Sequence, residues 1–451
     1  MGLTAKRDWI YPADNAGRFR SARKKVGWAL IAFFVLAPWI RFRGMPAVRI
    51  DIPGRRFTLL GQLFTPHDTW ALALLMLVFA LAIMLFTALL GRVWCGWACP
   101  QTVWLEWVYR PIERFFEGPA HRRARREKQG KTKQWWRIKL AKHAAYAAVT
   151  LGTTFIFLTW FVGGPELFRG EIGSTGVFMG VMLFALFYAD ATWFREQLCN
   201  YACPYARLQG VLMDKRSLVV AYDEARGEPR TKSKGEGGDC VDCNRCVAVC
   251  PGGVDIRQGD QLQCIACAGC IDACDEIMVK IGKPKGLIRY TTKRDERASA
   301  GEWKPQLSHP RVYAYAAVMV ALAVALLVGL AVRSETVFWA ARSAGGELYM
   351  QLPNGQVANQ FHLHVTNRDT AARSYTVASL TEGVDVTAPG QPWTVDWGQE
   401  LRVPGFVSAS PQAFAAGRKT AELQVVRDDG EVGTVEITLL GPDGAAVGGA
   451  R

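Results

Sequence analysis

Five apolar stretches place the strongest constraint on how this chain of 451 residues can fold. A helix needs about 20 residues to cross a bilayer core, because each helical residue rises only about 1.5 Å. Each stretch comes close to this length. The stretches cover residues 26–40, 70–90, 143–162, 173–194 and 312–332. They predict a multi-domain membrane protein with a helical bundle of about five spans. We interpret the first as a retained span, because it lacks a small-residue cleavage site.

Positive charge predicts the orientation of these helices. Lys and Arg are concentrated before the first stretch and between the second and third, including the run 122–128. Because positive loops stay in the cytoplasm, we expect the N-terminus inside and the C-terminus outside, although the loop from Arg41 to Arg56 runs against the rule. With Trp135 and Trp136 nearby, the basic run should lie against lipid headgroups. Nucleic acid is not expected, since no nucleic-acid-binding motif accompanies the charge.

Eight of the 12 cysteines form two runs with C-x2-C-x2-C-x3-C spacing between the fourth and fifth stretches. Such runs are typical of proteins with two [4Fe-4S] clusters, in which the fourth cysteine of each run ligates the other cluster. The ligands expected for the first cluster are Cys240, Cys243, Cys246 and Cys274. Those expected for the second are Cys264, Cys267, Cys270 and Cys250. Structural zinc is the alternative, which the triplet spacing disfavours.

The other cysteines form two matched C-x3-C-P pairs, each following an apolar stretch. They are Cys95, Cys99, Cys199 and Cys203. Both pairs should lie at the cytoplasmic end of a helix, where four thiols can converge. We expect Arg92 and Arg195 to favour thiolates, which bind soft ions such as Cu(I) or exchange electrons. The alternative, that these cysteines merely fill space as small hydrophobic residues, is weakened by the duplication. Metal binding and disulfide cycling both stay open.

The last part of the chain has a different pattern. Residues 333–451 hold 9 Lys and Arg against 13 Asp and Glu, although the whole chain carries +14, and they contain no cysteine. Short alternating runs such as 361–365 and 432–439, separated by Gly, Pro, Asn and Asp, predict an antiparallel β-sandwich. We expect it to dock rather than catalyse.

His362 and His364 share one face of a strand, and we interpret them as an exposed pair, because two ligands make an incomplete metal site.

These patterns divide the chain into five parts. Residues 1–25 form a basic N-terminus, 26–210 a four-span membrane domain with both C-x3-C-P motifs, 211–310 a dicluster ferredoxin-like domain, 311–332 the fifth helix and 333–451 the outer sandwich. Asp190 lies late in the fourth stretch. It could serve proton or quinol chemistry, or be a solvated or Arg-paired carboxylate.

Four segments together resemble the cytochrome c oxidase accessory protein family CcoG, also called FixG or RdxA. They are residues 17–20, 94–104, 199–207 and 264–275, and the segment from 348 looks like this family's immunoglobulin-like C-terminal domain. The resemblance implies a bacterial inner-membrane protein with cytoplasmic clusters and a periplasmic sandwich. It implies cupric reductase activity that supplies Cu(I) during maturation of the cbb-type oxidase.

The same resemblance implies roles for the cysteines and for partners. The ferredoxin cysteines would be cluster ligands, and the paired cysteines would be the copper-reducing or relay thiols. Expected partners are membrane lipid, copper chaperones or oxidase assembly factors, and an unidentified electron donor. Two alternatives are an electron conduit to a partner oxidoreductase and a non-redox scaffold whose sandwich binds oxidase subunits.

Overall fold

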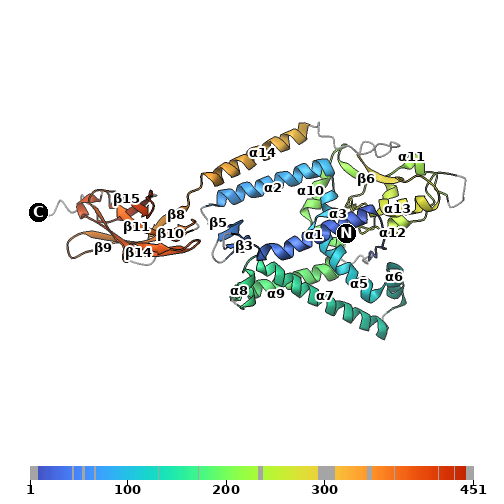
Figure 1. Cartoon of the computed structure of the whole chain (residues 1–451), viewed down its shortest axis with the longest axis horizontal. Helices are drawn as coiled ribbons and strands as arrows, with labels where there is room; N and C mark the ends of the chain where they lie inside the picture. The colour runs from blue at the N-terminus through green and yellow to red at the C-terminus, as the bar shows by residue number, and fades with distance from the viewer. Residues whose placement is uncertain are drawn as a thin grey trace. The chain divides into compact units, whose positions relative to one another are not determined.

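A computed structural model describes residues 9–42, 45–52, 56–65, 68–130, 132–170, 172–231, 237–292, 310–342, 348–369, 371–414, 416–430 and 432–442. The chain divides into two compact units, a helical unit (Met1–Val328) and a C-terminal unit (Gly329–Arg451). Figure 1 shows helices throughout the first unit and strands throughout the second.

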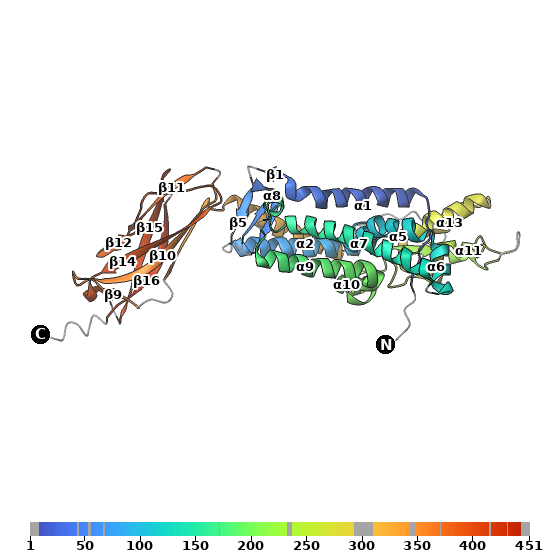
Figure 2. The same cartoon turned by 90° about the horizontal axis from the view of Figure 1, so that it is seen from below.

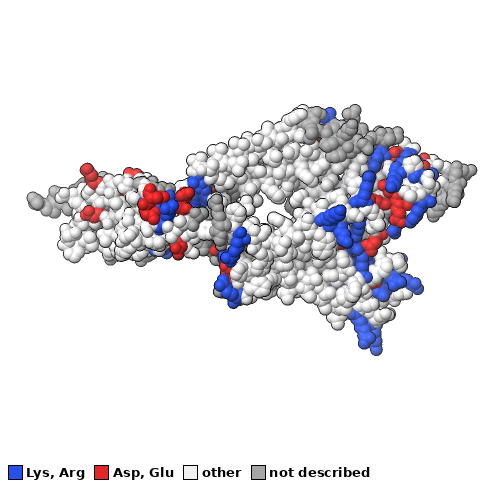
Figure 3. Space-filling model, viewed as in Figure 1, with Lys and Arg blue, Asp and Glu red and all other residues white. Residues whose placement is uncertain are grey.

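Within the described ranges, three helices are long and apolar enough to cross a membrane. They are α2 (Thr69–Leu90), the continuous helix of α9 (Ser174–Ala189) and η4 (Asp190–Phe194), and α14 (Pro310–Ala331). These are the second, fourth and fifth predicted spans. On the face seen in Figure 3, the surface over α2 and α14 is nearly free of charged side chains, as a lipid-facing surface should be.

Three of the five predicted spans are long and apolar enough, and the other two are not clear spans. The first stretch lies in α1 (Arg18–Leu36), whose first two turns are basic, and the turn η1 (Ala37–Trp39) follows it, so the apolar part is too short. The third lies in α7 (Lys133–Thr159), which begins with basic residues and buries polar ones. In both views α1 runs roughly parallel to α2, whereas Figure 1 shows α7 inclined to α2 (Figures 1 and 2).

Short helices and small sheets complete this part of the helical unit. The helices are α3 (Val93–Trp97), α4 (Pro100–Trp104), η3 (Leu105–Tyr109), α5 (Arg110–Glu117), α6 (Ala120–Gln129), α8 (Gly164–Phe168), η5 (Leu198–Ala202) and α10 (Pro204–Leu212). The strands are β1 (Arg41–Phe42), β2 (Met45–Pro46), β3 (Val48–Asp51), β4 (Arg56–Leu59) and β5 (Gln62–Phe64).

The ferredoxin region is built around one antiparallel strand pair, β6 (Leu218–Tyr222) and β7 (Ile288–Thr292). Every residue of β6 is buried, because this strand lies inside an apolar core shared with the cysteine loops. The loops carry α11 (Glu224–Gly227), α12 (Arg245–Ala248), η6 (Ile256–Gln258) and α13 (Gly269–Lys280).

The C-terminal unit is an antiparallel sandwich, which confirms the predicted all-β fold of this part. One sheet has the order β12-β14-β10-β8 with β9 beside β10, and the other β13-β11-β15-β16. Alternate residues of facing strands, such as Phe361 and Leu423, fill the core between the sheets. The strands are β8 (Thr336–Arg342), β9 (Met350–Gln351), β10 (Val357–Asn367), β11 (Arg373–Ser379), β12 (Val384–Thr387), β13 (Trp393–Val395), β14 (Glu400–Ala409), β15 (Arg418–Arg427) and β16 (Val432–Leu440); the turn η8 (Pro411–Ala413) follows β14.

Candidate functional site

The two four-cysteine runs follow the same backbone path. Asp242 and Asn244 flank Cys243 with φ of 48° and 54°, and Ala266 and Ala268 flank Cys267 with φ of 49° and 58°. Left-handed residues beside right-handed ones turn successive N–H groups toward one point, a concavity that binds anionic groups, including iron–sulfur clusters. The runs therefore form two similar loops, each followed directly by a helix.

Each loop closes over a cavity that contains one expected set of ligands. The first cavity is lined by Cys240, Cys243, Cys246 and Cys274. The second is lined by Cys250, Cys264, Cys267 and Cys270, together with Cys246. All twelve cysteines are free of disulfides. The donor set and the loop conformation fit one [4Fe-4S] cluster in each cavity.

Backbone N–H groups point at the sulfurs of the second cavity. Val254 N donates to Cys250 Sγ over 3.2 Å, and the backbone at Ala266 favours the Cys264 thiolate. Such bonds stabilise sulfur that carries negative charge and raise cluster potential. Burial raises the pKa of the free Cys250 thiol to about 11 and that of Cys264 to about 12. A coordinated metal overcomes this cost, because it deprotonates its thiol ligands.

The N-terminal segment is fastened to the cluster region. Asp272 on α13 accepts hydrogen bonds from Phe19 N at 3.2 Å and Arg20 N at 2.7 Å, so it caps the start of α1. A Cβ at Gly17 would lie 2.2 Å from Asp272 Cγ, which explains the glycine at this point. Sequence reasoning missed Asp272 as a partner, because the two residues are far apart in the chain.

The two C-x3-C-P motifs also share a backbone conformation just before their first cysteine. Gly91, four residues before Cys95, has φ 56° and ψ −124°, and Arg195, four residues before Cys199, has φ 52° and ψ −125°. Glycine adopts this conformation without strain, whereas a residue with a Cβ is strained by about 1–3 kcal/mol. Two short contacts to Glu113, of 2.9 and 3.0 Å, hold the Arg195 side chain in place.

The four paired cysteines are half-buried and close to one another. Burial raises the pKa of Cys95 to about 11 and that of Cys199 to about 12, and repulsion from the neighbouring thiolates adds to both shifts. Every pair among the four thiols interacts in this way. Among the described residues, no three Cys, His, Asp or Glu side chains are placed to hold a single metal ion. The four thiols are near enough to interact electrostatically, and they do not enclose a mononuclear site.

The two upstream arginines have other partners than the expected thiolates. Arg92 donates to the carbonyl oxygen of Gln261 at 2.6 Å, and Arg195 pairs with Glu113. Arg92 lowers the pKa of Cys95 only slightly, because burial dominates. Arg92 thus favours the Cys95 thiolate as expected, but burial outweighs it, and Arg195 is engaged by Glu113 instead.

The first C-x3-C-P motif packs directly on the loop of the second cavity. A Cβ at Gly96 would lie 2.4 Å from the carbonyl oxygen of Ile265 and 2.9 Å from Cys267 Cα, so only glycine permits this approach. Beside it, Trp97 Nε1 donates to the Tyr290 hydroxyl at 3.3 Å. The first C-x3-C-P motif and the loop of the second cavity are thus in direct contact.

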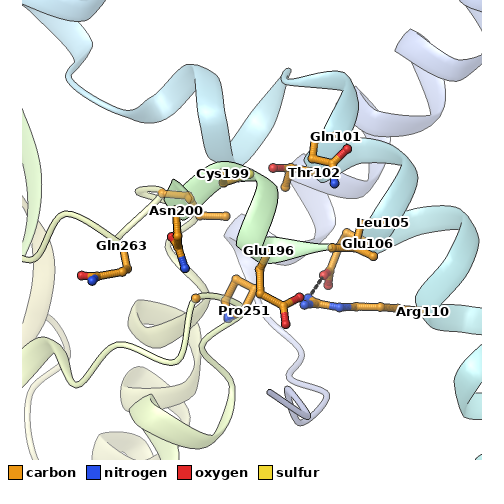
Figure 4. A pocket seen from close by; sticks show the side chains of 12 residues that line it. Gln101, Thr102, Leu105, Glu106, Arg110, Glu196, Cys199, Asn200, Pro251 and Gln263 are labelled. Atoms are coloured by element: carbon orange, nitrogen blue, oxygen red, sulfur yellow. Dashed lines mark hydrogen bonds and ion pairs between the residues drawn. The ribbon is translucent and has the colours of Figure 1, made fainter. Parts of the chain in front are cut away.

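A pocket of about 420 Å³ lies where the second motif meets the same loops (Figure 4). Cys199, Ile265 and Leu105 are among the residues that line it. The ion pair between Glu106 and Arg110 closes one side. The pocket brings a paired thiol and a cluster loop to the same small space. Its lining is completed by Gln101, Thr102, Glu196, Asn200, Pro251, Gly252 and Gln263.

A row of buried carboxylates runs away from this pocket. Glu106, Glu113 and Glu117 are each paired with two or more cations. Their partners are Arg20, Arg110, Arg114, Arg123, Arg195, Lys139 and Lys142. Although burial opposes ionisation, Arg195 and its neighbours lower the pKa of Glu113 to about 2. Part of the basic run expected at the lipid surface is thus buried, although Figure 3 shows other basic side chains exposed at this end of the helical unit.

Two lesser candidates are placed by their partners. Asp190 accepts a hydrogen bond from Gln101 Nε2 at 3.0 Å, and the same nitrogen donates to the carbonyl oxygen of Arg195 at 3.1 Å. In the C-terminal unit, His364 Nδ1 lies 2.8 Å from Glu400 Oε1, and its ring stacks on Trp339. Asp190 therefore contributes to the packing between the two cysteine motifs.

Comparison with known proteins agrees with this site. Residues 72–119 match the family model "4Fe-4S binding domain", 194–293 match "4Fe-4S dicluster domain", and 326–442 match "IG-like fold at C-terminal of FixG". Protein RdxA of Cereibacter sphaeroides is 38% identical over 394 residues, 83% of each chain. Protein RdxB of the same organism is 35% identical over 95% of this chain and 93% of its own. The nitrogen fixation protein FixG of Rhizobium meliloti is 40% identical over 66% of this chain and 60% of its own.

The fold and the site define a membrane protein that carries electrons through iron–sulfur clusters and has an immunoglobulin-like C-terminal domain. Within that class, the chain belongs to the RdxA and FixG family.

Proposed function

We propose that this protein reduces Cu(II) to Cu(I) at or near the paired cysteines and supplies Cu(I) during assembly of a cbb-type cytochrome c oxidase. One observation carries the proposal: Gly96, inside the first C-x3-C-P motif, lies against the loop that contains Cys267. An electron held in the second cavity is therefore next to the thiols. Cu(I) is the copper ion that thiols prefer, so reduction and capture favour each other.

The chain's own residues arrange this chemistry. When bound, the two [4Fe-4S] clusters supply one-electron carriage. Of the twelve cysteines, Cys243 alone is exposed, so the first cavity is the side at which a reductant can approach. Cys246 lines both cavities and joins them. Each Cu(II) ion takes one electron, which an external donor must replace.

The location and partners belong to the same proposal. The concentration of Lys and Arg around the cluster region supports a cytoplasmic position for it, with the immunoglobulin-like domain in the periplasm of a bacterial inner membrane. Partners are then membrane lipid, an electron donor on the cytoplasmic side, and copper chaperones or oxidase assembly factors.

A second candidate is an electron conduit that reduces a partner protein rather than copper. It is favoured by the "4Fe-4S binding domain" model, because its match, residues 72–119, includes Cys95 and Cys99. On this reading, the paired cysteines would pass electrons or hold a further iron–sulfur group.

Steady-state copper reduction tests the proposal. The full chain is purified anaerobically in detergent, reduced chemically, and mixed with Cu(II) and a chelator that reports Cu(I). The matched variant replaces Cys95, Cys99, Cys199 and Cys203 by Ala, with iron content checked against about 8 Fe for two four-iron clusters. We expect turnover by the wild type that is lost in the variant. Equal turnover would make copper reduction incidental to the clusters, and none in either protein would favour the conduit.

A further inference from the structure

A buried glutamine contacts one of the paired thiols. Gln209 on α10 is 1% exposed, and its Nε2 donates to Cys95 Sγ over 3.0 Å. Because α10 begins directly after Cys203, this bond joins the second half of the repeat to a thiol of the first half. Gln209 has no part in the cysteine pattern of the sequence, so spacing alone could not find it.

Two neighbours fix the orientation of the Gln209 amide. The Thr87 hydroxyl donates to the carbonyl oxygen of Ile83 at 2.7 Å, so its oxygen accepts the hydroxyl proton of Tyr205 at 2.6 Å. The Gln209 side chain lies beside Tyr205 and acts as a donor toward its oxygen. Gln209 therefore presents its nitrogen, not its oxygen, to the sulfur.

The other half of the repeat lacks this donor. When Cys95 is aligned with Cys199, Gln209 corresponds to Leu105, and Leu105 lines the pocket that contains Cys199 (Figure 4). Leu105 lines the same pocket as Cys199, but of the two corresponding side chains only the glutamine has an N–H group to donate. The repeat is symmetric in its backbone and asymmetric in this contact.

We propose that Gln209 is a positioning residue of the copper-reducing site, which fixes the Cys95 sulfur and supplies the hydrogen bond that a copper-bound thiolate accepts. The inference rests on the proposed function of the four thiols and deepens it. Hydrogen-bond partners of metal ligands typically change metal affinity or activity about 10–100-fold when they are removed. Cys95 is then the held thiol of the repeat, and Cys199 is the thiol that faces the pocket.

The test uses the full chain in detergent with its iron content checked. Gln209→Met keeps the length of the side chain and removes the N–H, and Leu105→Met is the matched control in the other half. Both are made in the wild type and in a Cys95→Ala background. Cu(I) affinity is measured by competition with a Cu(I) chelator. We expect Gln209→Met to lower affinity about 10–100-fold in the wild type and less than about 2-fold without Cys95.

Two results would overturn the inference: an unchanged affinity in the wild-type background, or an equal loss in both backgrounds, which would indicate a merely structural role. A readout without copper distinguishes a failure of the Gln209 inference from a failure of the proposed function. Alkylation of Cys95, followed by mass spectrometry, should slow about fivefold in Gln209→Met. If the wild type reduces no copper but alkylation of Cys95 slows in Gln209→Met, the proposed cupric reduction is wrong and the inferred role of Gln209 is supported. If the wild type reduces copper but neither Cu(I) affinity nor Cys95 alkylation changes in Gln209→Met, only the inferred role of Gln209 is wrong.

Discussion

At the residue scale, glycines mark the points where separate segments meet. Gly17 makes room for the Asp272 carboxylate, and Gly96 makes room for the backbone at Ile265 and Cys267. Neither glycine has a distinctive spacing, yet each lies in a contact on which the site depends. The cysteines supply the chemistry, and these glycines allow the cysteine-bearing segments to touch.

Replacing Gly96 by Ala tests the importance of this close approach. The added Cβ would lie 2.4 Å from the Ile265 carbonyl oxygen, so the motif must move away from the second cavity. We expect a loss of about 1–3 kcal/mol in stability, as for other overpacked sites, and slower oxidation of the reduced clusters by Cu(II). Thermal unfolding and stopped-flow absorbance measure the two effects.

Gly152→Ala is the matched control, because a Cβ at Gly152 on α7 meets nothing within 4 Å. It should leave the oxidation rate unchanged and raise stability by about 0.5–1 kcal/mol, because alanine is favoured over glycine in a helix interior. Unchanged kinetics in Gly96→Ala as well would show that the contact is not needed for electron transfer.

At the element scale, α5 is a helix that buries charges in pairs. Glu113 contacts Arg123 at 2.9 Å and Arg195 at 2.9 Å, and all three side chains are almost fully buried. Arg195 comes from the turn before the second C-x3-C-P motif, so Glu113 sets the position of that turn. A buried pair of this kind holds a fold in one arrangement, since a lone buried charge is costly.

Glu113→Gln should therefore destabilise the helical unit by about 3–5 kcal/mol, because it leaves two guanidinium groups without their carboxylate. Chemical unfolding followed by intrinsic Trp fluorescence measures the loss. Lys142→Met is the comparison. It breaks the neighbouring ion pair with Glu117 and leaves the pair between Arg195 and Glu113 intact. A loss under about 1 kcal/mol in Glu113→Gln would contradict the assignment.

The same pair predicts a dependence on pH. The pKa of Glu113 falls from 4.5 to about 2 in the folded chain, so the folded state binds this proton more weakly than the unfolded state. Its contribution to stability is complete above about pH 4.5 and is lost as the pH falls toward 2. The wild type should lose stability more steeply than Glu113→Gln across this window. Parallel unfolding curves from pH 5 to pH 3 would argue against it.

Local sequence predicted those elements that local chemistry determines. The triplet spacing predicted that four named cysteines would meet at each cavity, and the apolar runs predicted α2, α9 and α14. The pairing of Glu113 with Arg195, and of Gln209 with Cys95, depends on segments brought together only by the fold. The first and third predicted spans are less clear for a related reason: in α1 and α7 the apolar residues follow basic turns, which a count of apolar residues does not register.

At the scale of the whole molecule, two units of different chemistry share one chain. The helical unit contains every cysteine, whereas the C-terminal unit has an apolar core of its own and an excess of acidic residues. Stability of the first unit should depend on iron, because metal binding to ligands that converge only in the folded state is part of the folding free energy. The second unit has no such dependence.

Iron removal should therefore affect only one unit. In a buffer without denaturant, an iron chelator is expected to lower the unfolding temperature of the helical unit and to leave that of the sandwich unchanged. Hydrogen exchange read separately for residues 218–292 and 357–440 distinguishes the two. Equal loss of protection in both ranges would show that the units do not fold independently.

The central claim is that electrons leave the clusters through the paired cysteines, and single-turnover kinetics test it most directly. The chemically reduced, iron-replete chain is mixed rapidly with Cu(II), and cluster oxidation and Cu(I) formation are followed together. We predict that both proceed at one rate, with one Cu(I) per electron lost, and that both slow at least about tenfold in the Cys95, Cys99, Cys199, Cys203→Ala variant with intact clusters. Equally fast cluster oxidation in that variant would contradict the account.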